Sequence, residues 1–160
     1  MRLPGTERRG RHGHPADLFA AGSRKRSLHW RGFQINDGDI KVTRGFTIHC
    51  DNILTNNLEI NWAGGNNFHM EKNTLINVSC TKPTVPNPPA ADVSRIVADA
   101  VGECNGLPAS IHIILEDRGE PGTNDRASFV ITGGCSLNLS ERPIDGGNIQ
   151  AHFDQPHKVK

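Results

Sequence analysis

The chain contains no tyrosine, only two tryptophans and two methionines, and hydrophobic residues make up just 35% of it. Aromatic residues reach only 5%, whereas glycine (17) and proline (10) are frequent. This balance disfavours long helices with a broad apolar stripe and favours many short strands joined by turns. The 160 residues are enough for one domain with its own core. The lack of tyrosine also leaves few residues for an aromatic sugar-binding platform.

No apolar run is long enough to span a membrane, and Leu18–Ala21 is too short for the apolar part of a signal peptide. The four cysteines include no CxxC pair, which disfavours a zinc ribbon and favours disulfides formed in an oxidising compartment. Because such disulfides require export, the missing signal leads us to expect that Met1 is not the natural start. We predict an extracytoplasmic protein, secreted or at the cell surface.

Charge is unevenly distributed along the chain. Residues 1–30 contain seven basic and two acidic residues and carry +5, so the remaining 130 residues sum to −4. Residues 1–32 show no apolar period, so we predict a disordered basic arm there, a β domain over 33–153 and a tail over 154–160. A basic arm can hold nucleic acid, but no recognisable nucleic-acid module follows it, so we expect no nucleic-acid partner.

Apolar residues alternate with polar ones in several segments of the β domain, as expected for strands with one buried face. The clearest hairpin joins Leu58–Trp62 to Phe68–Met70 through the turn residues Ala63–Asn67. The proline-rich segment 82–90 is predicted to be an extended, polyproline-like crossover on the surface. Residues 91–101 fit either a helix or a strand. Some eight or nine short strands predict an all-β fold, an antiparallel β-sandwich or small barrel.

An acidic loop over 117–125 separates two alternating segments, Ile111–Leu115 and Ala127–Ile131. Its oxygen-bearing side chains can ligate Ca²⁺, which prefers several oxygen ligands, and they are Asp117, Glu120, Asn124 and Asp125. The alternative is a structural turn, in which the Asp and Asn side chains accept hydrogen bonds from nearby backbone N–H groups.

Three histidines in strand-like segments, His49, His69 and His152, could form a zinc or copper site if the fold brings them together. The alternative is that each imidazole lies solvated or hydrogen-bonded on the polar face of its strand. No serine lies in a nucleophile-elbow motif, and no glycine-rich phosphate loop precedes a helix. His49 and Cys50 are adjacent strand residues that point to opposite faces, so they do not form a thiol–imidazole pair. We therefore do not expect an enzyme.

Several separate motifs resemble an uncharacterised domain of bacterial exported proteins, the β domain found C-terminal to choice-of-anchor and adhesin-like modules. The motifs are Ile48–Asp51, Asn57–Trp62, Gly65–Met70, Cys80, Asn105–Gly106, Asp117–Asp125 and Gly146–His152. The resemblance covers about residues 38–152 and implies a non-catalytic, extracytoplasmic β module. It implies no substrate or catalytic residue, and Cys104 and Cys135 are not part of the family pattern.

Cys50 and Cys80 each end an apolar stripe, so both side chains should face one interior, and the resemblance retains the same two residues. We predict a Cys50–Cys80 disulfide, while Cys104 and Cys135 either pair or remain free. The predicted function is that of a structural or interaction module whose partner is a protein or a cell-envelope component. The alternative is a metal-dependent activity at His49, His69 and His152, with a separate calcium loop.

Overall fold

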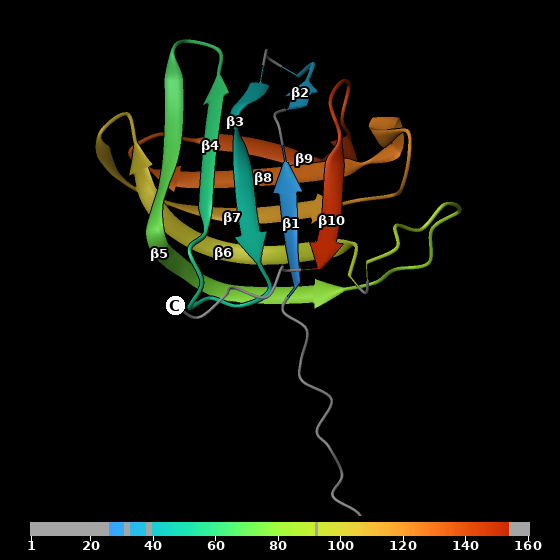
Figure 1. The fold of residues 1–160 in the computed structure, drawn as a ribbon. Coiled ribbons are helices and arrows are strands. Elements are labelled where there is room, and N and C mark those ends of the chain that lie inside the picture. The colour runs from blue at the N-terminus through green and yellow to red at the C-terminus, as the bar shows by residue number, and fades with distance from the viewer. Residues whose placement is uncertain (1–25, 31–32, 38–39, 92, 154–160) are drawn as a thin grey trace, which may run out of the picture.

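The computed structural model describes residues 26–30, 33–37, 40–91 and 93–153. These residues form an all-β, antiparallel fold, as predicted, with a single 3-10 turn (Figure 1). The described elements are β1 Arg26–Trp30, β2 Phe33–Ile35, β3 Ile40–His49, β4 Asn57–Trp62, β5 Asn66–Thr81, β6 Arg95–Cys104, β7 Leu107–Glu116, η1 Gly122–Asn124, β8 Arg126–Gly133, β9 Leu137–Pro143 and β10 Ile149–Phe153.

The strands pair in the order β10-β1-β3-β4-β5-β6-β7-β8-β9, and β2 pairs separately with β3. One layer contains β10, β1, β3, β4 and the first part of β5, while the rest of β5 continues into a second layer that runs crosswise behind it (Figure 1). Ten strands are therefore described, against the eight or nine predicted. β1 and β2 were not recognised in the sequence, whereas two segments predicted as separate strands, around residues 68–70 and 76–80, form the single strand β5.

β5 passes from one layer to the other at an irregular point in its pairing with β6. The register shifts between Met70 and Leu75 and again between Leu75 and Asn77. Gly102 of β6 lies opposite this point, and a Cβ there would stand 2.2 Å from the carbonyl oxygen of His69. A bulge bends a strand, and a glycine lets the partner backbone come close, so together they allow the sheet to fold over itself.

The core lies between the two layers and comes from the alternation seen in the sequence. Its largest fully buried side chains are Phe46, Phe68, Phe129, Ile35, Ile48, Leu58, Ile60, Met70, Ile96, Ile113 and Leu115. The ambiguous segment 91–101 contributes to β6, where Ile96, Ala98 and Ala100 are buried in strict alternation. Strand pairing on both sides of β6 decides this segment in favour of a strand.

Two predictions about chain organisation need correction. The predicted arm over 1–32 includes β1, which pairs with both β10 and β3, so the β domain extends at least to Arg26. Residues 1–25 and the predicted tail over 154–160 lie outside the described residues. The proline-rich segment is not a crossover, because β5 and β6, which it joins, are direct neighbours from Thr81 and Arg95 onward.

An ion-pair network on the outer face of the second layer fixes the start of the acidic loop. Arg95 of β6 donates to Glu116 of β7 and to Glu141 of β9, with an Nη2–Oε2 distance of 2.7 Å for the second pair. Arg118 Nε lies 2.8 Å from Glu116 Oε1. Glu116 is only 4% exposed, so its carboxylate needs these partners, and the backbone that enters the loop is held in place.

Candidate functional site

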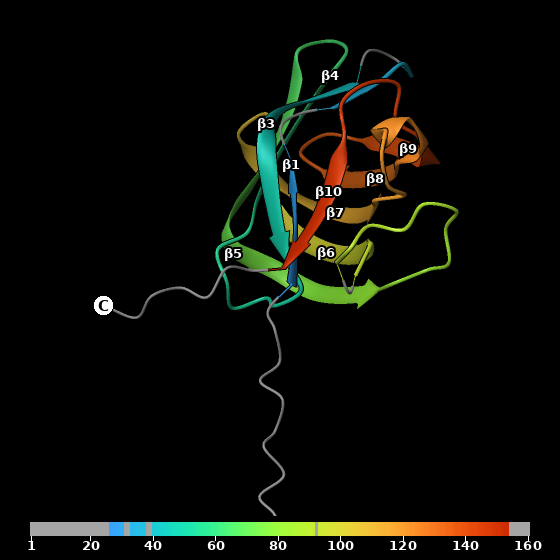
Figure 2. The ribbon, with the colours of Figure 1, turned by 45° about the vertical axis from the view of Figure 1, so that its right-hand side comes forward.

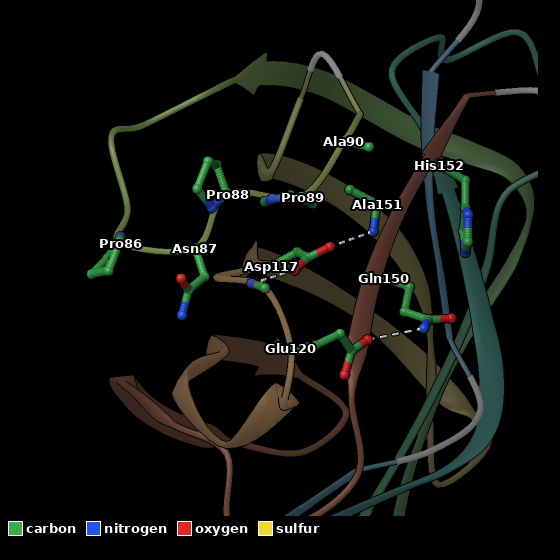
Figure 3. A pocket seen from close by; sticks show the side chains of 11 residues that line it. Pro86, Asn87, Pro88, Pro89, Ala90, Asp117, Glu120, Gln150, Ala151 and His152 are labelled. Carbon is green, nitrogen blue, oxygen red and sulfur yellow. Dashed lines mark hydrogen bonds between the residues drawn. The ribbon is translucent and has the colours of Figure 1, made fainter.

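A surface groove of about 600 Å³ lies beside strand β10. Its walls come from the proline loop (residues 82–94, between β5 and β6), the acidic loop (residues 117–125, between β7 and β8) and β10 itself (Figures 2 and 3). The lining residues are Pro86, Asn87, Pro88, Pro89, Ala90, Asp117, Gly119, Glu120, Gln150, Ala151 and His152. Apolar residues of the proline loop thus face polar side chains of the acidic loop and of β10 across the groove.

The acidic loop is held to β10 by two buried carboxylates. Asp125 is 0% exposed, and it accepts hydrogen bonds from the backbone N–H of Arg118 (2.8 Å) and of Ile149 (2.7 Å). Asp117 is 5% exposed, and it accepts hydrogen bonds from the backbone N–H of Gly119 (2.8 Å) and of Ala151 (2.7 Å). Each carboxylate therefore joins its own loop to one residue of β10.

Ile149 and Ala151 are two residues apart on β10, so their N–H groups point to the same side of the strand. One edge of β10 pairs with β1, and no strand of the described structure pairs with its other edge. The two aspartates accept hydrogen bonds from the backbone N–H groups at this other edge. An unpaired strand edge is open to association with other chains. The carboxylates thus protect this edge in place of a further strand.

Burial shapes the ionisation of both aspartates. It raises the pKa of Asp125 to about 6, and the neighbouring charges of Asp117 and Glu120 raise this pKa further. The hydrogen bonds from the N–H groups of Arg118 and Ile149 act in the opposite direction and lower it. Burial likewise raises the pKa of Asp117. The charge of Glu120 raises this pKa further, whereas His152 lowers it. Because the folded-state pKa lies above the usual value of 3.8, the stabilisation from a protonated Asp125 is complete below about pH 4 and is lost as the pH rises through about 6.

Glu120 lies at the exposed end of the acidic loop and is held by side-chain amides. Its Oε1 accepts hydrogen bonds from Asn148 Nδ2 (2.7 Å) and from Gln150 Nε2 (3.2 Å), the second of which is drawn in Figure 3. No lysine or arginine of the described structure forms an ion pair with Asp117, Glu120 or Asp125. Among the described residues, the carboxylates of the groove are therefore stabilised mainly by hydrogen-bond donors.

The proline loop is packed against the body of the domain. Val85, Ala91 and Val93 are buried, and Lys82 Nζ donates to the carbonyl of Ala91 at 2.7 Å. The two loops also touch, because a Cβ at Gly119 would lie 1.8 Å from the Asn87 carbonyl oxygen. Both walls of the groove therefore have a defined position without any ligand.

We expect Gly119→Ala to lower the free energy of unfolding by about 3 kcal/mol or more, because the new methyl group collides with the proline loop and the φ of +89° is strained for alanine. Gly106→Ala is the matched control: its φ is +78°, but nothing lies within 4 Å of the added Cβ, so a loss of about 1 kcal/mol is expected. Urea unfolding of both variants measures the difference. Equal losses would show that the two loops do not press on each other.

The structure brings together residues that the sequence analysis had assigned to two different sites. Asp117 and Glu120 of the predicted calcium loop line the groove with His152 of the predicted histidine site. Asn124 is exposed and Asp125 lies buried, and neither lines the groove.

His49 and His69 do not line the groove either. His49 alternates with the core residue Ile48 along β3, but at 9% exposure it is not solvated. Its backbone N–H donates to Asn56 Oδ1 of the loop that follows β3. His69 lies on β5, opposite Glu59 and Glu103 of the neighbouring strands. Within the described ranges, no group of three or more His, Cys, Asp or Glu side chains is positioned to hold a metal ion. The acidic loop itself contains the contacts of the structural-turn alternative, since Asp125 accepts the N–H of Arg118 and Asp117 accepts that of Gly119.

We expect the melting temperature to be the same in millimolar calcium and in excess chelator, because both carboxylate oxygens of Asp117 and of Asp125 already accept backbone N–H bonds. A ligand bound only to the folded state would raise it. Differential scanning calorimetry under the two conditions makes the comparison. A rise of several degrees in calcium would re-establish Asp117, Glu120, Asn124 and Asp125 as a metal site.

The four cysteines form two disulfides in the structure. Cys50 is bonded to Cys80, as predicted, and Cys104 is bonded to Cys135, which decides the alternative left open by the sequence. The Cα–Cα distances of 5.9 Å and 5.7 Å are ordinary for disulfides. No described helix is long and apolar enough to cross a membrane.

Sequence reasoning missed the β10 side of the groove and the contribution of the proline loop. The sequence predicted a last edge strand at Ile149 and Ala151 but gave it no part in a site, and the prolines were assigned only a connecting role. No local pattern links these segments, because their contacts with the acidic loop span 24 to 34 residues of sequence.

The fold and the groove define this chain as an all-antiparallel, disulfide-bonded β domain with a preformed surface groove. Comparison with protein-family models, with curated proteins and with solved structures gives no match. The functional argument therefore rests on the residues of the groove and on the two disulfides.

Proposed function

We propose that this protein is a non-catalytic interaction module that works outside the cytoplasm, secreted or at the cell surface of a bacterium, and that the groove beside β10 is its contact surface. The observation that carries the proposal is that the groove carboxylates already accept hydrogen bonds from the protein itself. Asp117 uses both oxygens to hold backbone N–H groups, so it is not available as a general base or nucleophile. Glu120 is held by two side-chain amides.

The two disulfides support the extracytoplasmic assignment, because such bonds persist in oxidising compartments and are rare in reducing ones. A test is to trap free thiols with an alkylating reagent in the native host and to map the cysteines by mass spectrometry. Two intact disulfides, Cys50–Cys80 and Cys104–Cys135, are expected. Alkylation of all four cysteines would contradict the assignment.

The rigid construction of the groove supports a binding role. One wall is fixed by prolines and by buried side chains of the proline loop such as Val85. The other wall is fixed by the buried Asp117 and Asp125, so little ordering is required when a partner binds. The partner that fits is a protein or a cell-envelope component with hydrogen-bond donors or positive charge, since the exposed carboxylate of Glu120 lines the groove.

A photo-crosslinking residue at Gln150, inside the groove, tests this role in living cells. The matched control places the same residue at Ser140, an exposed position on β9 outside the groove. A discrete crosslinked product from position 150 and none from position 140 is expected. Equal crosslinking at both positions, or none at position 150, would contradict a binding role for the groove.

A further inference from the structure

The two buried aspartates connect the acidic loop to β10, a strand with a single strand partner among the described residues. β10 pairs with β1 on one side. On the other side, the described structure holds it by the bonds from Ile149 N–H to Asp125 Oδ2 and from Ala151 N–H to Asp117 Oδ2, both 2.7 Å long. Opening of this edge therefore exposes both carboxyl groups to water at the same time.

Three acidic groups face one another at this position. Asp125 lies within electrostatic reach of Asp117 and Glu120. Asp117 faces Glu120 from its own loop and His152 from β10. Other charged groups nearby are engaged elsewhere: the Arg118 guanidinium bonds Glu116, the Lys82 ammonium bonds the Ala91 carbonyl, and Asp145 accepts the Asn36 N–H.

We propose that Asp117 and Asp125 form a proton-operated latch on β10, which holds the strand most firmly while one of the two carboxyls is protonated and lets the edge open more often when both are ionised. With the proton on Oδ1, the oxygen that accepts from the acidic loop itself, Oδ2 remains a carbonyl acceptor for the β10 N–H. The strand then remains bonded while the repulsion between buried charges is removed. Once the edge opens, both groups are hydrated and ionise at their usual, lower pKa.

The direction of the effect follows from the linkage between proton binding and opening. The closed state binds the proton more tightly than the open state, so acidification favours closure and a rise in pH favours opening. With a pKa of about 6 in the closed state and 3.8 in the open one, the opening equilibrium increases about tenfold between pH 5 and pH 7.5. The change is confined to β10 and the acidic loop.

Amide hydrogen exchange of the full chain, measured by NMR, tests the latch. After correction for intrinsic exchange, the protection of the Ile149 and Ala151 amides is expected to fall about tenfold from pH 5 to pH 7.5. The amides of Ile113 and Phe129, in the core strands β7 and β8, serve as internal controls and should not show this fall. The carboxyl carbon of Asp125 should titrate with a midpoint near pH 6.

Two variants complete the test. In Asp125→Asn, which cannot ionise, the protection of the Ile149 amide should become nearly independent of pH. In Glu103→Gln, which removes an exposed carboxylate that is not among the groups facing the latch, the protection should fall with pH as in the wild type.

Protection that rises or stays constant from pH 5 to pH 7.5 in the wild type would overturn the proposal. An equal fall in Asp125→Asn would overturn it too, since another group would then be responsible. If Asp125→Asn does not fold, the carboxyl titration of the wild type decides: a midpoint at or below pH 4 rejects the latch.

Discussion

Removal of residues 1–30 is expected to abolish the folded state or to lower its free energy of unfolding by roughly 5 kcal/mol or more, which is as large as the whole stability of many small domains. β1 is an inner strand of the sheet, paired along its length with β10 and in its middle with β3. Without it, β10 loses its strand partner, and the fully buried Ile149 loses the strand that holds it in the core.

The matched control for this truncation is removal of residues 1–25 only. It deletes six of the seven basic residues of the segment 1–30 but leaves β1, and the sequence predicts these residues to be an arm without core contacts. We expect this shorter truncation to leave the melting temperature unchanged within about 2 °C. Circular dichroism melting of both truncated proteins makes the comparison. If the two melt alike, β1 does not contribute as an inner strand.

The second large effect is expected from the Cys50–Cys80 disulfide. Replacing both cysteines by alanine should lower the free energy of unfolding by about 3–4 kcal/mol, because the bond closes a loop with a sequence separation of 30 residues and restricts the unfolded chain. The bond ties the segment after β3 to the end of β5, and both cysteines pack against the core. Chemical denaturation of the oxidised proteins measures the loss.

The second disulfide is an internal comparison for the first. Cys104–Cys135 has nearly the same sequence separation, 31 residues, so the chain-entropy contribution should be equal. Cys104 is 0% exposed, and its replacement by alanine also removes buried volume, so the Cys104→Ala/Cys135→Ala variant should lose somewhat more stability. A loss below about 1 kcal/mol in both double variants would contradict a stabilising role for the disulfides.

Much of the fold could be predicted because its signals are local. The alternation in β4, β7 and β8 follows from the two-residue period of a strand, and it assigns Leu58, Ile113 and Phe129 to the core. The segment that became β6 fitted a helix equally well, and its pairing with β5 and β7 decided it. The glycine- and asparagine-rich turn between β4 and β5 needs no tertiary information either. β1 escaped prediction because five residues inside a basic segment give too few apolar positions for a period to be recognised.

The site was only partly predictable, because its geometry depends on contacts between distant segments. The composition of the acidic loop singled out Asp117 and Glu120, and strand position singled out His152, but the three were assigned to separate sites. Local sequence gives no information about whether a carboxylate will be exposed and able to bind a metal or buried and bonded to backbone N–H groups. In this chain, the answer comes from β10, 24 residues beyond Asp125.

The sequence by itself determined the all-β class, the main hairpins and many core positions, because period-2 burial and turn residues act over a few neighbouring positions. The Cys50–Cys80 bond was predicted from the ends of two apolar stripes together with the family resemblance. Only the tertiary structure decided the inner position of β1, the return of the proline loop to the neighbouring strand, and the burial of Asp117 and Asp125 beneath β10. The last of these features depends on the contact between the free edge of β10 and the acidic loop, which lie far apart in the sequence. The physical reason is that backbone donors at such an edge must be satisfied, and the groups that satisfy them lie far away in the sequence.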